Sequence, residues 1–97
     1  MDDKAPDWMT RNADGSVTVK LRRAASISGA ATNALTMREP TVEDQIAAGA
    51  GNSKADTATM EVALFANLCM VQPEAIRGLT LHDYGRLQRA FADFLRD

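Results

Sequence analysis

The sequence predicts an α+β fold in which a small N-terminal β-hairpin is followed by three to four helices, with a disordered N-terminal tail. Three observations predict it. Apolar and polar residues alternate over residues 17–22, which is the period of a half-buried strand. Pro40 is followed at once by a helix start at Thr41. A long amphipathic helical pattern begins at Thr80 and runs to the end of the chain.

The composition predicts one domain with a thin core. The chain has 97 residues, of which 45% are hydrophobic but only 5% aromatic, so few large side chains are available for burial. A net charge of −2 provides no long-range attraction for phosphates, so we expect no nucleic-acid partner. No apolar run reaches the roughly 20 residues that span a bilayer, and residues 1–11, which begin with two aspartates after Met1 and contain no apolar run, do not look like a secretory signal. We expect a cytoplasmic protein without a membrane partner.

The first fifteen residues predict a tail. Residues 1–15 are polar, contain Pro6 and show neither strand nor helix periodicity, so we assign them as a flexible tail and residues 16–97 as a single domain. Trp8 is the exception in this segment. It either docks on the domain or remains an isolated exposed ring, and the sequence leaves both open.

Two extended segments predict the hairpin. Val17, Val19 and Leu21 alternate with polar residues, and residues 35–38 form a second strand. Between them, residues 24–33 are small and polar and predict a connecting loop.

A helix is predicted directly after Pro40, because proline moves the preceding Glu39 away from helical geometry. The side-chain oxygen of Thr41 can accept a hydrogen bond from a free amide of the first turn, and the Asp44 side chain can reach back toward the start of the helix. Val42 and Ile46 would form the apolar stripe of this helix, which should end near residues 49–52.

Two further helices are predicted on either side of a short turn. A helix from Asp56 carries apolar residues around a wide arc that includes Cys69, which we interpret as a small buried hydrophobic residue, and it ends before Pro73. One helical turn and Leu79 follow. The last helix then starts at a second threonine cap, Thr80, which has an aspartate three residues later at position 83.

The last helix carries an apolar stripe at three- and four-residue spacing, and this stripe is the candidate partner-binding surface. Either it packs within the chain or part of it forms an exposed seam for another helix. The two arrangements can coexist. The stripe consists of Tyr84, Leu87, Phe91, Phe94 and Leu95.

The sequence predicts no catalytic, cofactor-binding or metal-binding residues. The single histidine, His82, has no second ligand nearby at metal-binding spacing. Glu43 and Asp44 are adjacent in a first helical turn and are interpreted as helix-start residues rather than an acid–base pair. The basic clusters Arg22-Arg23 and Arg86/Arg89 are typical of solvated faces.

The order of these segments resembles the phage tail assembly chaperone family of Mu-like and P2-like tailed phages, which includes proteins similar to tail protein E. The resemblance extends from Val17 to Leu95 and rests on the strand at residues 17–21, the junction at residues 35–44 and the helix start at residues 79–84. The positions that match are interpreted as fold-defining, with Thr41 and Thr80 as caps. They are Arg38, Glu39, Pro40, Asp44, Leu79, Asp83, Phe94 and Leu95.

The resemblance implies a protein without enzymatic activity. Such a chaperone would bind the tape-measure protein in the cytoplasm of the bacterial host, keep it soluble while the tail tube polymerises, and be absent from the mature virion. Family members of this kind also commonly have a frameshift-extended form of themselves, which is a further expected partner. Self-association through the helical face is expected as well.

Two alternatives come from other classes. A small DNA-binding regulator would use residues 56–95 as a helix-turn-helix reader. A structural tail or baseplate subunit would remain in the virion.

Overall fold

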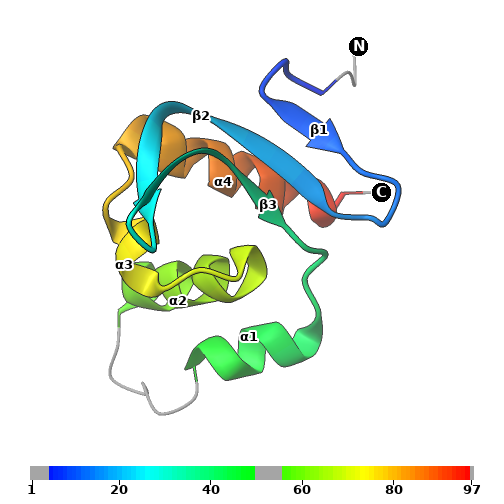
Figure 1. The fold of residues 1–97 in the computed structure, drawn as a ribbon. Helices are drawn as coiled ribbons and strands as arrows, with labels where there is room; N and C mark the ends of the chain where they lie inside the picture. The colour runs from blue at the N-terminus through cyan, green and yellow to red at the C-terminus, as the bar shows by residue number, and fades with distance from the viewer. Residues whose placement is uncertain (1–4, 50–55, 97) are drawn as a thin grey trace.

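The computed structural model describes residues 5–49 and 56–96, and it confirms the α+β class. A three-stranded antiparallel sheet with the order β1-β2-β3 is followed by four helices (Figure 1). The strands are β1 (Met9–Arg11), β2 (Val17–Ile27) and β3 (Ala30–Met37), and the helices are α1 (Val42–Gly49), α2 (Thr57–Cys69), α3 (Pro73–Arg77) and α4 (Leu81–Phe94).

The predicted tail is wrong for Met9–Arg11, which forms β1 and pairs with the start of β2. Met9 lies opposite Val19 and is only 4% exposed, so its side chain belongs to the core. Trp8 is half-buried and docks on the domain, with the Arg86 guanidinium 5.1 Å from the centre of its ring. This strand could not be predicted from the sequence, because a single buried methionine among polar neighbours does not produce the alternation that is typical of a strand. The first four residues of the predicted tail lie outside the described residues.

The predicted loop over residues 24–33 is also wrong, because the hairpin continues through it. Ala25, Ser26 and Ile27 pair with residues 30–32 of β3, and the two strands meet in a tight turn. Ser28 and Gly29 form that turn with φ values of 52° and 83°. Positive φ at both central positions matches the right-handed twist of the flanking strands.

β2 carries an irregularity in the middle of the hairpin. Lys20 pairs with Ala34, and the next paired residue of β2 is Ala25, opposite Thr32. More residues of β2 than of β3 lie between these pairs, so β2 bulges and bends sharply (Figure 1).

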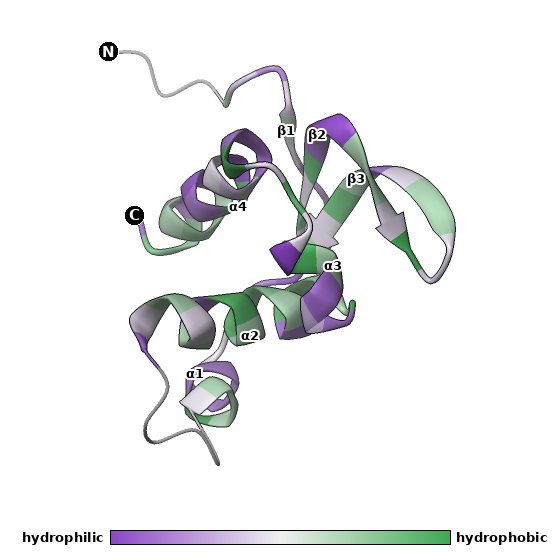
Figure 2. Cartoon of the chain, turned by 90° about the vertical axis from the view of Figure 1, so that its left-hand side faces the viewer, coloured by the Kyte–Doolittle hydropathy of each residue, from purple (hydrophilic) through white to green (hydrophobic). Residues whose placement is uncertain are grey.

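The core lies between one face of the sheet and the helices α2 and α4. Phe65 of α2 is fully buried at its centre, with its ring centroid 5.6 Å from those of both Tyr84 and Phe91 of α4. Cys69 is buried as predicted. Burial raises the pKa of its thiol to about 12, so the group stays protonated at neutral pH. Figure 2 shows the apolar colour along α2 and alternating colours along β2 and β3.

α1 lies outside this core and packs on α2. Its predicted stripe is wrong: Val42 and Ile46 are 78% and 60% exposed, whereas Asp44 and Ala48 are the buried positions. The helix is rotated from the predicted orientation because the Asp44 carboxylate is held on its inner side by Arg38. Two large apolar side chains are therefore left in solvent.

Candidate functional site

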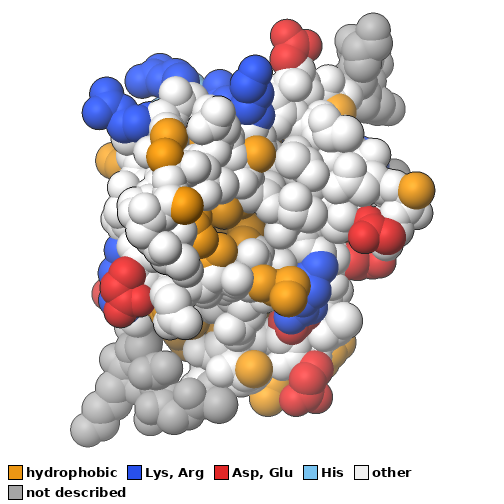
Figure 3. Space-filling view, in the orientation of Figure 1, with side chains coloured by type: hydrophobic (Ala, Val, Ile, Leu, Met, Phe, Trp, Pro, Cys, Tyr) orange, Lys and Arg blue, Asp and Glu red, His pale blue; other side chains and the backbone are white. Residues whose placement is uncertain are grey.

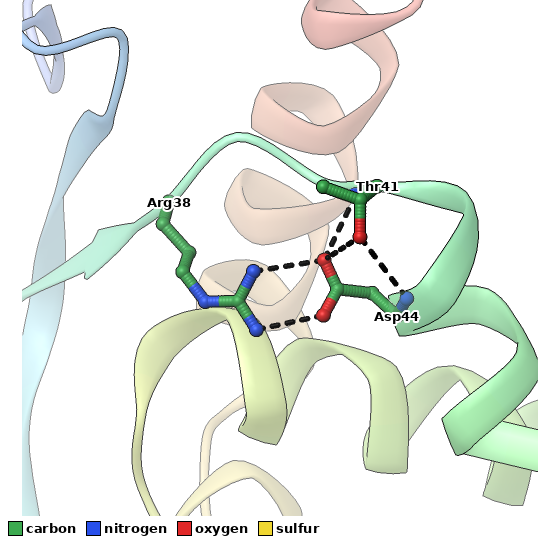
Figure 4. A network of polar contacts seen from close by, with 3 residues as sticks. All are labelled: Arg38, Thr41 and Asp44. Atoms are coloured by element: carbon green, nitrogen blue, oxygen red, sulfur yellow. Dashed lines mark hydrogen bonds and ion pairs between the residues drawn. The ribbon is translucent and has the colours of Figure 1, made fainter.

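The junction between β3 and α1 is built around the Asp44 carboxylate (Figure 4). The Arg38 guanidinium donates to both carboxylate oxygens of Asp44, at 2.8 and 2.7 Å. The Thr41 amide also donates to Asp44, at 2.8 Å, and the Asp44 amide donates to the Thr41 hydroxyl at 3.2 Å. This reciprocal exchange is the capping box that the sequence indicates, extended by a bidentate ion pair. It fixes the direction in which α1 leaves the sheet.

The other two junction residues occupy the surface near this network. Pro40 is half-buried, and Glu39 is exposed beside the β1–β2 turn. A Cβ atom added to Gly15 would lie 3.4 Å from the Glu39 carboxylate oxygen Oε1. Arg38 and Asp44 make the ion pair, whereas Glu39 forms none with any residue in 5–49 or 56–96.

The start of α4 uses its aspartate differently from the start of α1. Thr80 caps the helix by accepting from the Asp83 amide at 3.1 Å, as the sequence indicates. The fully buried Asp83 carboxylate instead accepts from the amides of Arg22 and Arg23, at 2.8 and 3.0 Å. These are the amides that the bulge removes from the strand ladder. Asp83 therefore joins α4 to β2, and half-buried Leu79 packs against the core just before it.

Burial raises the pKa of the Asp83 carboxyl, but the two backbone amides and the nearby charges of Arg86 and His82 outweigh burial, so the pKa is lowered. The aspartate is charged at neutral pH, which strengthens both hydrogen bonds.

The stripe of α4 is divided by the fold. Leu87 is fully buried and forms part of the core. Tyr84, Phe91 and Phe94 are half-buried against it, and the Tyr84 hydroxyl donates to the Glu61 carboxylate of α2. Leu95, just beyond the helix, is 69% exposed. Of the five predicted residues, Phe91 and Leu95 line a groove beside α1, whereas Tyr84 lines a separate hollow beside α3.

This groove lies between α1 and the end of α4, with α2 as its floor. It has two continuous sections that share Gln45, Leu64, Phe91 and Leu95, and the larger section has a volume of ≈ 370 Å³. The exposed Val42 lines the smaller section. We call this feature the apolar groove, and its further lining includes Pro40, Ala48, Thr57, Met60 and Glu61.

The sequence did not indicate the α1 side of the groove. A hydrophobic pair four residues apart usually faces the core, so the sequence alone places Val42 on the inner side of α1. The available signal was Arg38 six residues before Asp44, which turns the opposite side of α1 inward.

No group of three or more histidine, cysteine, aspartate or glutamate residues in the described ranges is placed to hold a metal ion. Within those same ranges, none of the helices has the length and hydropathy needed to cross a membrane. His82 is exposed at the start of α4.

A small α+β domain with a capped helix projecting from its core and an open apolar groove presents a surface suited to binding another protein. The model of the phage tail assembly chaperone family, described as "phage tail assembly chaperone proteins, E, or 41 or 14", matches residues 18–96. The chain belongs to this family. Searches of curated protein sequences and of solved structures gave no match.

Proposed function

We propose that this protein binds the tape-measure protein of its phage through the apolar groove and keeps that protein soluble while the tail tube assembles. Family membership and the open groove support the proposal. The observation that carries it is the exposure of Val42, Ile46 and Leu95 at the groove and on the adjoining surface of α1. Large apolar side chains clustered at a groove mark an interaction surface.

A helix of the client fits this shape better than an extended strand does. The groove is bounded by helices and floored by Leu64 of α2, so an apolar ridge at three- and four-residue spacing could enter it. Each contact is small, and many copies along one long client would supply the affinity. Action in the host cytoplasm, the absence of catalysis, absence from the virion and a frameshift-extended partner form all belong to this proposal.

The test is co-expression of the protein with the tape-measure protein encoded by the same phage. Leu95→Asp places a charge at the groove, and we expect the amount of soluble client to fall at least about tenfold, because a carboxylate cannot be buried there without a partner. Leu81→Asp is the matched control. Leu81 is 87% exposed at the start of α4, the helix that Leu95 follows, but it does not line the groove.

Both variants should keep the circular dichroism spectrum and melting temperature of the wild type, because both leucines are exposed. Leu87 is unsuitable for this test, since a charge at a fully buried position would unfold the domain. A Leu95→Asp variant that holds the client in solution as well as the wild type would exclude the groove. A client that stays soluble without the chaperone would overturn the proposal itself.

The DNA-binding alternative gains no support from α4. The Arg86 guanidinium packs on Trp8 and donates to the Lys20 carbonyl oxygen at 2.7 Å. Arg89 lies 3.6 Å from the Asp93 carboxylate. Arg86 and Arg89, the two arginines that α4 would use to contact DNA, therefore both interact with other residues of the chain.

A further inference from the structure

The apolar groove is lined by one acidic side chain. Glu61 of α2 lines its larger section, together with Met60, Leu64 and Phe91. All other described residues that line either section are apolar or carry a neutral amide or hydroxyl group. Glu61 is half-buried at this place. The described lining of the groove is therefore neutral except for one carboxylate.

Two side chains of α4 hold this carboxylate. Its oxygen Oε1 accepts hydrogen bonds from the Tyr84 hydroxyl and from the Gln88 side-chain amide, the latter at 2.9 Å. The two donors are four residues apart, so they lie on the same side of α4 and reach the same oxygen. Burial, followed by the hydrogen bond to Glu61 and the negative charge of Glu61, raises the pKa of the Tyr84 hydroxyl, which therefore remains a donor at neutral pH. These contacts restrict the orientation of Glu61.

The other carboxylate oxygen of Glu61, Oε2, has no partner in residues 5–49 and 56–96. No group in those ranges donates a hydrogen bond to it. Glu61 also takes no part in the ion pairs of the described residues. Its two donors, Tyr84 and Gln88, are neutral. The carboxylate is therefore held in place, but no cation of the described chain neutralises it.

The helices around the groove supply no cation. α1, which forms one wall, and α2, which forms the floor, contain no lysine or arginine. Two arginines of the adjoining segments are paired with aspartates: Arg38, before α1, with Asp44, and Arg89 of α4 with Asp93. Figure 3 shows the largest cluster of basic side chains at the upper left, over the bend of β2, and an acidic side chain at the bottom, over α1. The basic side chains of this face are therefore concentrated away from the α1 wall.

A helix that fills the groove removes water from Glu61. A carboxylate that exchanges water for apolar side chains destabilises the complex unless it gains a partner. A lysine or arginine of the incoming helix supplies that partner, because it donates to the free oxygen and neutralises the charge. The stem of either side chain is apolar, so it can pack on the groove lining while its charged end reaches Glu61. Wholly apolar helices and acidic helices lack this compensation.

We propose that the apolar groove selects client helices in which a lysine or arginine adjoins the apolar ridge, and that Glu61 pairs with this cation. The inference rests on the proposed function, because it specifies which helices of the client the groove accepts. The apolar ridge supplies contact area, and the unpaired carboxylate disfavours helices that have no cation at that position. Glu61 therefore determines specificity in addition to linking α2 to α4.

The experiment measures the affinity of client peptides for the full chain by fluorescence anisotropy. Overlapping peptides of about 20 residues, long enough for several helical turns, cover the tape-measure protein of the same phage. Peptides that bind the wild type but not Leu95→Asp are assigned to the groove. The lysine and arginine residues of each groove peptide are then replaced singly by glutamine.

Replacing the pairing cation should weaken binding to the wild type at least about tenfold, because Glu61 is then enclosed without a counter-charge. Glu61→Gln should weaken binding of the original peptide, and in this variant the replacement in the peptide should have little further effect. This double-mutant cycle isolates the pairing of the two charges. Glutamine keeps an oxygen that can accept from Tyr84 and Gln88, so the melting temperature should stay near that of the wild type.

Glu74→Gln is the matched control, because it removes one carboxylate from an exposed position of α3 that does not line the groove. It should bind the peptides as the wild type does. Groove peptides that keep their affinity after every cation is replaced would overturn the inference while the proposed function stands. A replacement that weakens binding to Glu61→Gln as much as to the wild type would overturn it equally. If no client peptide binds in a manner that depends on Leu95, binding through the groove and this inference fail together.

Discussion

Asp83 shows how one buried side chain connects distant parts of the chain. Its carboxylate accepts from two amides about 60 residues earlier in sequence, at the point where the β2–β3 ladder is interrupted. The bulge would otherwise leave two donors without partners beside the core. A bent β2 and a docked α4 therefore depend on the same residue.

Replacing Asp83 by alanine should lower the free energy of unfolding by about 2–4 kcal/mol, because two backbone amides lose their charged acceptor, whose side chain is fully buried. Urea denaturation followed by circular dichroism measures the change. Asp56→Ala is the control, since Asp56 caps α2 from an exposed position and its loss should cost only about 1 kcal/mol. Equal losses in the two variants would contradict a special role for Asp83.

Asp44 should make the stability of the domain depend on pH. The Arg38 guanidinium and the Thr41 amide and hydroxyl hold the pKa of the Asp44 carboxyl well below its ordinary value of 3.8. A pKa that is lower in the folded state contributes stability above the ordinary value, and this contribution is lost as the pH falls toward the folded value. The free energy of unfolding should therefore decrease below about pH 4.

Asp44→Asn isolates this contribution, because Asp14, Asp56 and Asp83 have lowered pKa values as well and act in the same direction. Urea titrations at pH 6, 4 and 2.5 should show the stability difference between wild type and variant shrinking as the pH falls. A difference that stays constant over this range would show that Asp44 titrates normally in the folded protein.

At the scale of elements, the sequence was sufficient to predict a helix start or end wherever a single residue, such as proline or a capping threonine, determines the local backbone conformation. Thr41 and Thr80 cap the starts of α1 and α4, and Pro73 takes the first position of α3 just beyond the end of α2, so the order of the helices could be predicted from the sequence. The orientation of α1 could not. It depends on the pairing of Arg38 with Asp44, a contact between the end of a strand and the first turn of a helix.

The hairpin illustrates the same limit. Small residues over 24–33 are compatible with either a loop or a strand, and pairing with the opposite strand decides between them. The local signal was the Ser28-Gly29 dipeptide, in which serine adopts a positive φ that asparagine tolerates better. The apolar groove was harder still to predict, because its residues come from three helices whose relative positions no local pattern specifies.

Ser28→Asn should stabilise the hairpin by about 0.5 kcal/mol, because asparagine before glycine is the favoured pair for a turn with two positive φ values. Thermal unfolding measures the gain. Gly29→Ala should have the opposite effect, at a cost of about 1 kcal/mol, through backbone strain alone, since an added Cβ would meet nothing within 4 Å. A neutral result for both would show that the turn contributes little to the stability of the domain.

At the scale of the whole molecule, stability and binding are assigned to different parts. The sheet, α2 and α4 enclose the fully buried side chains Phe65, Leu68 and Leu87. α1 contributes little to this core and instead forms one wall of the apolar groove. Surface changes on α1 should therefore alter binding without unfolding the domain, which makes the two roles experimentally separable.

The N-terminal arm, defined as Ala5–Arg11, belongs to the stable part. Its β1 strand covers one edge of β2, Met9 enters the core, and Trp8 packs on Arg86 of α4. The arm therefore joins the sheet to the last helix, and we expect it to unfold together with the domain.

Trp8 is the single tryptophan of the chain, so its fluorescence reports on the arm directly. In urea, the Trp8 transition should coincide with the loss of helical circular dichroism, as in a two-state domain. Met9→Ala should lower the free energy of unfolding by about 2 kcal/mol, because it leaves a cavity beside Val19. Thr10→Ala, at an exposed position of the same strand, should change it by less than about 0.5 kcal/mol. A Trp8 transition at lower urea than the helical one would mean that the arm detaches before the domain unfolds, and the sheet would then be stable with only β2 and β3.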